Sequence, residues 1–441
     1  MAPSAYPLGG VQTWLDYLLP GLRQLGWRCT LGLVAGRFHD PDAYLAVHPG
    51  SSVVAIASRT GTQEGRIRSL AGCIARLRPD LVASVNVPDC HAAVARARRR
   101  GVRVRTVMTM HGLQADYYED MAATASKLDA VVCTNRLAWA LSTEIGGIEP
   151  RRAHYAPYGV GLDRGTPRPA SQTGGTPFRV AFVGRLARYQ KRVEDLPRIA
   201  HELDRLGHLF ELVIAGSGPD EGWLRQALAV PLANGKVRFL GSVAADRLAD
   251  EVYSGADALL ITSSWETGPI VAWEAMAAGV PVVTSAYIGS GLEGSLQHGE
   301  TCLVFPIGAA AAAAACIARL HRSSALRGKL AAGGRKLIEE RYSCERSVAQ
   351  WSAVLSQIAA APPITRVAGP SEPEAASSGR LDRVLGVAWG ETMRGALGRR
   401  FVAASAGSEW PHSYGTTPLD DPDFWRLAAA LDGRGTARHD S

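Results

Sequence analysis

Two glutamates eight residues apart are candidates for binding a ligand rich in hydroxyl groups. Glu266 and Glu274 flank Gly268-Pro269, where a loop is expected to turn into a helix, because glycine permits a tight turn and proline suits a first helical turn. The apolar run Ala258–Ile261 predicts a buried parallel strand, which places Glu266 at the carboxyl edge of a sheet. Since a helix N-terminus also attracts anions, the arrangement fits a nucleoside-diphosphate sugar. The alternative is that both glutamates are ordinary surface charges.

A group of cations follows the strand expected at 178–183. Gly184 permits the chain to turn, and Arg185 and Lys191 stand in the loop that leads into the next helix. Fixed cations at the carboxyl end of a strand are well placed to hold a diphosphate. The alternative is that both are solvated loop charges, as most arginines and lysines are.

Gly216-Ser-Gly218 raises the alternative of a dinucleotide site. The pattern G-x-G-x-x-G requires a third glycine at position 221, but that residue is Glu221, and Pro219 intervenes. A nicotinamide-dependent oxidoreductase is therefore a minor alternative.

Length and composition are those of a globular protein with two domains. The chain has 441 residues, 46% hydrophobic and 20% charged, and its net charge of +7 favours anionic partners. Seven cysteines are scattered and never spaced C-x-x-C, which argues against a disulfide framework or a zinc site and for a reducing compartment. We find no signal-peptide pattern and no apolar run of the ~18 residues that a membrane span needs. We therefore expect a cytoplasmic protein.

Strand-like and helical stretches alternate along most of the chain, which predicts parallel sheets covered by helices on both faces. The segment 161–177, rich in Pro and Gly, is interpreted as a linker between two such series. After Ala361 the composition predicts partial disorder, with helices at Leu381–Leu397 and from Asp421-Pro422 to Leu431. The expected strands are Thr30–Val34, Val53–Ala57, Leu81–Val85, Val102–Met108, Ala130–Cys133, Arg179–Val183, Glu211–Ala215, Val237–Leu240, Ala258–Ile261, Val280–Thr284 and Cys302–Phe305.

Several motifs resemble glycosyltransferase family four in their order and spacing. They are G-R-L at 184–186 with Q-K-R at 190–192, A-G-S-G-P at 215–219, F-L-G-S-V at 239–243, and E-T-G-P at 266–269 followed by E-A-M-A-A-G-V-P-V-V at 274–283. The resemblance covers about residues 6–360 and implies the α/β GT-B fold. It implies two facing Rossmann-like domains, an acceptor-side domain at 1–160 and a nucleotide-sugar domain at 178–342. A helix at 343–360 would cross back to the first domain, ahead of an extension at 361–441.

The resemblance also implies roles for individual residues. Arg185 and Lys191 match the pair that neutralises the donor diphosphate, Glu274 the ribose-binding carboxylate, and Glu266 the residue facing the donor sugar. His111, at the end of T-V-M-T-M-H-G, is similar to a first-domain histidine near the transferred sugar; the alternative is a structural histidine. Gly9 and Gly10 resemble the glycine pair of a loop near the phosphates or the acceptor. The remaining donor-binding positions are Gly184, Gly216, Gly218, Val243, Thr267, Gly268, Pro269 and Ile270.

The N-terminus departs from the family pattern. Only MAPSAYPL precedes Gly9, whereas family members have a complete strand there. The sequence therefore predicts that the first strand is missing, either because the start lies upstream or because the sheet is built without it.

Six arginines cluster at 96–105: Arg96, Arg98, Arg99, Arg100, Arg103 and Arg105. A solvated surface explains them, since cations complement a helix C-terminus. The functional alternative is docking to anionic lipid, or to an acceptor carrying phosphate, with the protein peripheral to the inner face of the membrane. Nucleic acid is not expected, because aromatic residues do not interleave with these arginines.

The predicted function is retaining transfer of a hexosyl or other glycosyl group from a nucleotide sugar to a sugar, lipid or other small acceptor. No D-x-D triad stands in a suitable loop, which agrees with the metal independence that the resemblance implies, and no cofactor is expected. The alternatives are a catalytically impaired, nucleotide-sugar-binding partner subunit and the Rossmann oxidoreductase.

Overall fold

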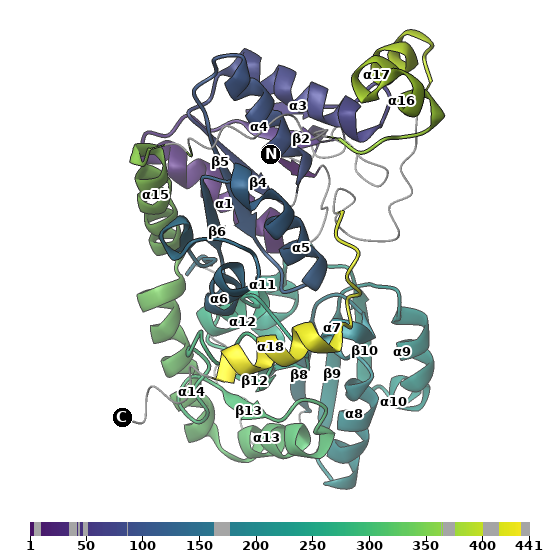
Figure 1. Ribbon diagram of the computed structural model, residues 1–441. Coiled ribbons are helices and arrows are strands. Elements are labelled where there is room, and N and C mark those ends of the chain that lie inside the picture. Colours follow the sequence, from purple (N-terminus) through teal and green to yellow (C-terminus); the bar gives the residue numbers. More distant parts are fainter. Residues whose placement is uncertain are drawn as a thin grey trace.

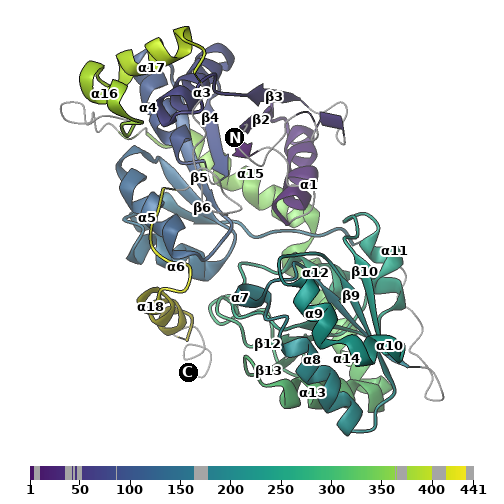
Figure 2. The same cartoon turned by 90° about the vertical axis from the view of Figure 1, so that its right-hand side faces the viewer.

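The structure is a computed structural model that describes residues 1–3, 10–34, 42, 45–46, 52–85, 87–162, 177–362, 364, 375–399 and 414–433. Two lobes, each built on a parallel sheet, face one another (Figures 1 and 2). The predicted α/β architecture of two Rossmann-like domains is confirmed. The predicted linker at 163–176 and most of 361–380 lie outside the described residues.

The first domain is built on a row of parallel strands: β1 (Ala2–Pro3), β2 (Leu31–Val34), β3 (Val53–Ile56), β4 (Leu81–Val85), β5 (Arg105–Met110), β6 (Ala130–Cys133) and β7 (Ala153–Tyr155). The sheets β1-β2-β3 and β4-β5-β6-β7 are joined through Met1. Its amino group donates to the carbonyl oxygen of Ala83 (2.6 Å), and its carbonyl oxygen accepts from the amide of Val85 (2.8 Å).

The expected absence of a first strand is corrected by the structure. Ala2 and Pro3 pair in parallel with Leu33 and Val34 of β2, so a strand does precede the glycine pair. Two residues are too few to produce a periodic apolar signal, which explains why the sequence did not reveal it. Gly9 lies outside the described residues, and Gly10 begins the first helix.

Helices pack on both faces of this sheet. They are α1 (Gly10–Gln24), α3 (Gln63–Leu77), α4 (Asp89–Arg99), α5 (Ala115–Thr124) and α6 (Arg136–Glu144), with short turns η1 (Ala125–Lys127) and η2 (Pro150–Arg152). On one face α3 and α4 enclose an apolar cluster that includes Ile67, Leu70 and Val94. The burial of these residues fixes the direction in which each strand and its loop leave the sheet.

The second domain has the strand order β10-β9-β8-β11-β12-β13, all parallel. Its strands are β8 (Phe178–Val183), β9 (Phe210–Ala215), β10 (Val237–Gly241), β11 (Ala258–Ile261), β12 (Val282–Ser285) and β13 (Leu303–Phe305). Its helical elements are α7 (Arg188–Lys191), α8 (Asp195–Arg205), α9 (Glu221–Ala227), α10 (Ala229–Ala233), α11 (Leu248–Glu251), η3 (Tyr253–Gly255), α12 (Ile270–Ala277), α13 (Ala310–Arg322), α14 (Ser324–Leu337) and the π-helical turn η4 (Ile338–Tyr342).

A long helix, α15 (Cys344–Ala360), follows the second domain and packs against α1 of the first. Trp351 is buried, and its ring centroid lies 4.9 Å from that of Trp14. The Tyr17 hydroxyl accepts from the amide of Gly159 (2.6 Å) and bonds to the hydroxyl of Ser347 (3.0 Å). The C-terminal part of the second domain is thereby anchored in the first.

Glu293, in the loop after β12, joins the two domains through its carboxylate. This buried side chain accepts from the hydroxyl of Tyr342 (2.6 Å) in its own domain. It also accepts from the hydroxyl of Tyr155 and the amide of Arg136 (3.1 Å), both in the first domain. A buried carboxylate is stable only when it is paired or hydrogen-bonded, so these contacts fix the relative position of the two domains.

The C-terminal extension forms α16 (Arg380–Leu385), α17 (Val387–Ala396) and α18 (Pro422–Gly433). The helix expected at Leu381–Leu397 is two helices, because Gly386 adopts a φ of 78° that breaks the helical path. In Figures 1 and 2, α16 and α17 lie at the end of the first lobe, whereas α18 lies where the lobes meet. Within the part of the chain that the structure describes, no helix combines the length and apolar character required to cross a membrane.

Candidate functional site

Glycines allow the loops after β8 and β9 to approach backbone to backbone. Gly216 has a φ of 141°, and a Cβ added there would lie 1.9 Å from the carbonyl oxygen of Gly184. A Cβ on Gly218 would lie 2.4 Å from the carbonyl oxygen of Leu186, whose amide donates to Ser217 (2.9 Å). Side chains at 216 and 218 would separate these loops. The structure therefore gives the predicted positions Gly216 and Gly218 a shared packing requirement, whereas Gly184 is favoured by its φ of 152°.

Lys191 and Glu266 form a direct ion pair at the carboxyl edge of the second sheet. The ammonium nitrogen of Lys191, the last residue of α7, lies 2.6 Å from Oε1 of Glu266, in the loop after β11. The hydroxyl of Ser263 donates to the same oxygen (2.6 Å). Glu266 is buried and Lys191 is half-buried, so solvent screens their attraction less than at a surface pair.

Helix α12 begins directly after this pair. The amides of Ala272 and Trp273 donate to the carbonyl oxygen of Pro269 (2.8 and 3.3 Å). The amides of Ile270 and Val271 lie between this first acceptor and its donors and belong to the terminal turn, where N–H groups have no intrahelical partner. Since Gly268 has a φ of 118°, the chain turns sharply from Thr267 into the helix.

Glu274 lies one turn further along α12 and is deeply buried. Its Oε2 accepts from the hydroxyl of Tyr253 (3.1 Å), which fixes the carboxylate beneath the helix start. Arg185 is half-buried between Gly184 and α7, and Val243 is half-buried after β10. The structure thus brings Lys191 and Glu266 into contact and places the other predicted donor residues in loops at the same edge of the sheet or, for Ile270 and Glu274, on α12 beside it.

His111 follows β5 and approaches this site from the first domain. Its carbonyl oxygen accepts from the hydroxyl of Thr267 (2.8 Å), the residue next to Glu266. Its imidazole nitrogens contact the hydroxyls of Tyr158 (2.6 Å) and Thr109 (2.9 Å). The ring centroid also lies 4.6 Å from that of Trp14. The backbone of His111 therefore reaches the second domain, while its side chain is held by partners in the first.

Burial lowers the pKa of His111 to about 3. The imidazole is therefore uncharged at neutral pH, where it exchanges hydrogen bonds with hydroxyl groups and carries no positive charge. This environment suits a positioning role better than that of a cation balancing a developing negative charge.

The sequence did not reveal several residues of the site. Ser263 and Tyr253 hold Glu266 and Glu274, but serine and tyrosine at these positions carry no distinctive pattern. Helix α18 was predicted from the sequence, but the sequence did not indicate what this helix contacts. The carboxylate of Asp432 accepts from the amides of Gly289 (2.7 Å), Gly291 (3.1 Å) and Leu292 (2.9 Å).

Aromatic contacts extend the role of α18 to both domains. The ring of Trp425 lies 5.5 Å from that of Trp265, which directly precedes Glu266. The ring of Phe424 lies 5.7 Å from that of Tyr118 on α5. The C-terminal helix is therefore packed beside the candidate site and against the first domain.

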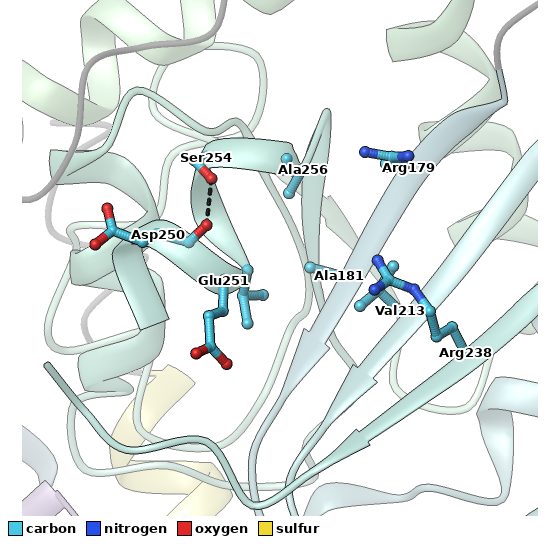
Figure 3. A pocket seen from close by; sticks show the side chains of 10 residues that line it. Arg179, Ala181, Val213, Arg238, Asp250, Glu251, Ser254 and Ala256 are labelled. Carbon is cyan, nitrogen blue, oxygen red and sulfur yellow. Dashed lines mark hydrogen bonds between the residues drawn. The ribbon is translucent and has the colours of Figure 1, made fainter. Parts of the chain in front are cut away.

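A pocket elsewhere in the second domain contains none of the predicted site residues (Figure 3). It lies beside β8 and β9, and its two arginines, Arg179 and Arg238, both pair with Glu211 (2.7 and 3.1 Å). The two guanidinium groups share this single carboxylate. Its lining residues are Arg179, Ala181, Val213, Arg238, Asp250, Glu251, Val252, Ser254, Gly255 and Ala256.

Three of the six arginines at 96–105 make structural contacts. Arg96 binds both carboxylate oxygens of Glu64 (2.9 and 2.8 Å), and Arg98 pairs with Asp129. Arg105 donates to the carbonyl oxygen of Ala361 (2.7 Å). These contacts favour the structural interpretation for Arg96, Arg98 and Arg105, whereas the other three arginines are exposed. Among the described residues, no group of three or more His, Cys, Asp or Glu side chains is arranged to hold a metal ion.

Two facing domains, each with a parallel sheet and with loops at the edges where they meet, define the GT-B class of fold. Two family models match successive parts of the chain, Glycosyltransferase Family 4 over residues 8–164 and Glycosyl transferases group 1 over residues 177–323. The chain belongs to glycosyltransferase family four.

Individual relatives are similar over shorter stretches. An uncharacterized glycosyltransferase of Methanocaldococcus jannaschii is 45% identical over 111 residues, 25% of this chain and 27% of the relative. Glycogen synthase of Mycobacterium tuberculosis is 29% identical over 238 residues, 51% of this chain and 56% of the relative. This chain thus spans from about a quarter to about half of the length of these two relatives.

A solved structure extends the likeness to the whole fold. HepE of Anabaena, in complex with UDP and glucose, superimposes with a TM-score of 0.65 over 80% of this chain and 98% of HepE. The sequence identity is 16%, so this likeness concerns the fold alone.

The low pKa of His111 predicts how stability depends on pH. The unfolded chain binds a proton at His111 below a pH of about 6.5, whereas the folded protein does not until about pH 3. Stability should therefore fall as pH decreases from 6.5. For this residue the loss is about 2 kcal/mol by pH 5, at about 1.4 kcal/mol per pH unit.

The test compares thermal unfolding at pH 7 and pH 5 for wild type and His111→Gln. The variant should lose less stability on acidification, since glutamine cannot take up the proton. His201→Gln, at an exposed position of α8, serves as the control and should behave as wild type. Identical acid sensitivity in all three proteins would show that His111 does not contribute.

Asp432 is predicted to hold α18 against the loop after β12. Asp432→Ala should increase hydrogen exchange in α18 and at residues 289–292, because three backbone amides lose their acceptor. The control is Asp423→Ala on the same helix, where the carboxylate is exposed and pairs with Arg426. Equal exchange in the two variants would contradict the prediction.

Proposed function

We propose that the protein transfers a glycosyl group from a nucleoside-diphosphate sugar to an acceptor, with retention of anomeric configuration. The observation that carries the proposal is the buried pair of Lys191 and Glu266, beside glycine-built loops and the start of α12. Family membership supports the reaction type, and the UDP and glucose bound in HepE support the donor class.

The cations and the helix start are suited to the leaving group. Departure of the diphosphate concentrates negative charge, which fixed donors in a partly buried site stabilise without reorganisation. Lys191 and Arg185 supply positive charge, and the first-turn amides of α12 supply hydrogen bonds. We propose that these groups perform the reaction without a metal ion or other cofactor.

The ion pair also explains how Glu266 and Lys191 act together. An ammonium has three donors, so Lys191 can bind a phosphate oxygen while it retains Glu266. Both known contacts of Glu266 engage Oε1. We assign Oε2 to a hydroxyl of the donor sugar, which links recognition of the sugar to positioning of the phosphate-binding cation.

Glu274 and His111 complete the proposed site. Glu274 would accept from the ribose hydroxyls, with Tyr253 fixing its orientation. His111 would position the transferred sugar from the first domain, through its backbone contact with Thr267. The acceptor, a sugar, a lipid or another small molecule, would enter on the side of the first domain.

Lys191→Ala is predicted to lower the rate of transfer by at least ~10²–10³, the loss typical of removing one preorganised donor to a developing negative charge. Lys329→Ala, on the exposed surface of α14, provides the matched control and should retain wild-type activity. Activity of Lys191→Ala within a few-fold of wild type would remove Lys191 from the mechanism.

The reaction is measured after the donor has been identified. Thermal shifts with UDP-, GDP- and ADP-sugars and with NAD would identify the base and would expose a dinucleotide-binding protein. NMR of the product then reports the anomer, which should match that of the donor, with and without EDTA. Binding without either hydrolysis or transfer would instead support the nucleotide-sugar-binding subunit.

A further inference from the structure

The hairpin formed by α16 and α17 exposes a concentration of large apolar side chains. Val384 is 80% exposed, Trp389 69% and Leu397 62%, with Leu385 and Met393 also exposed. Trp389, Met393 and Leu397 are spaced four residues apart and so share one side of α17. Exposed apolar surface of this kind, gathered on one element, marks an interaction site.

The charges of the hairpin have a consistent arrangement. Arg380, Arg383 and Arg399 are exposed, whereas its acids within 375–399, Asp382 and Glu391, are both buried. Asp382 pairs with Arg394 at 2.6 Å, inside the hairpin. The outer surface of the hairpin therefore carries apolar groups and positive charge, with no exposed acid among these residues to oppose it.

The hairpin is attached to the first domain through its other side. Glu391 accepts from the hydroxyls of Thr60 and Thr62, ahead of α3. Arg68 of α3 donates to the carbonyl oxygen of Ala388 (2.6 Å) and to the hydroxyl of Thr392 (3.0 Å). Because these polar contacts anchor residues 388, 391 and 392, the stripe of Trp389, Met393 and Leu397 points away from the domain.

We propose that this hairpin docks the protein on an anionic lipid bilayer. A helix that combines an apolar stripe with exposed arginines suits the interface, where tryptophan and aliphatic side chains enter the acyl boundary and arginines reach the anionic headgroups. The positive charge of the hairpin favours an anionic bilayer over an uncharged apolar partner. The hairpin also lies at the far end of the first lobe, where nothing in the second lobe obstructs a flat surface (Figure 1).

The hairpin is a better candidate for bilayer contact than the arginine cluster at 96–105. Three of the six arginines at 96–105 are paired with Glu64, Asp129 and a backbone carbonyl group, whereas the exposed arginines of the hairpin accompany exposed apolar groups. The proposal goes beyond glycosyl transfer, because binding to a bilayer is measured without donor or acceptor.

The experiment is sedimentation of the full chain with vesicles of phosphatidylglycerol and phosphatidylcholine, compared with phosphatidylcholine alone. Wild type should pellet with the anionic vesicles, and less so as salt is raised. The triple variants V384S/W389S/M393S and R380Q/R383Q/R399Q should each bind at least about tenfold more weakly. Circular dichroism and thermal unfolding establish that both variants are folded.

Two control variants each replace three exposed side chains outside the hairpin, apolar in one variant and charged in the other. V230S/L232S/L209S alters exposed apolar residues of the second domain, and R151Q/R247Q/R426Q removes three exposed surface charges. Both should bind vesicles as wild type does. With W389F, binding should persist while quenching of tryptophan fluorescence by brominated phosphatidylglycerol decreases.

Three results would overturn the proposal. The first is absence of wild-type binding to anionic vesicles, and the second is equal binding by the folded hairpin variants and their controls. The third is a dimer in analytical ultracentrifugation that V384S/W389S/M393S dissociates, without vesicle binding by wild type. That result would assign the apolar stripe to a second copy of the chain.

Discussion

The site depends on contacts between loops that follow the strands of two separate sheets. These loops, at the carboxyl edges of the sheets, lie within hydrogen-bond distance of each other. Parallel strands place their following loops at one edge, so each domain alone presents only half of the candidate site. Thr267 donates to the carbonyl oxygen of His111, and Asn135 donates to that of Gly289 (2.9 Å). With the carboxylate of Glu293, these contacts join loops that are more than 130 residues apart in the sequence.

Much of the fold could be predicted because each buried parallel strand is a short apolar run. The bounds of β4, β6 and β11 agree with the sequence, and β6 and β11 are buried at every residue. Strand β1 could not be predicted, since only two of its residues pair with β2. The break at Gly386 was missed for a related reason: the apolar pattern continues across it, and a single glycine does not by itself end a helix.

The sequence indicated individual residues of the candidate site but not the contacts between them. Spacing and resemblance indicate Lys191 and Glu266 separately, yet their ion pair joins positions 75 residues apart. Whether a cation contacts phosphate alone or also a neighbouring carboxylate depends on how α7 meets the loop after β11. The same limit applies to Asp432, whose three amide partners lie about 140 residues away and share no motif with it.

The helices of the C-terminal extension use their apolar side chains in two ways: α18 packs them against both domains, and the hairpin of α16 and α17 exposes them. Between its helices, the carboxylate of Glu119 on α5 accepts from the amides of Thr416 (2.7 Å) and Thr417 (2.9 Å), which leads the chain towards the junction of the lobes. There α18 places Phe424 and Trp425 against aromatic rings of both domains. The hairpin contacts its domain through the polar groups of Glu391, Thr392 and Ala388, with Val387 as an apolar contact, and leaves its larger apolar side chains exposed. Because burial of apolar surface drives association, an extension attached in this way retains an unsatisfied apolar side, and that side faces away from the catalytic fold.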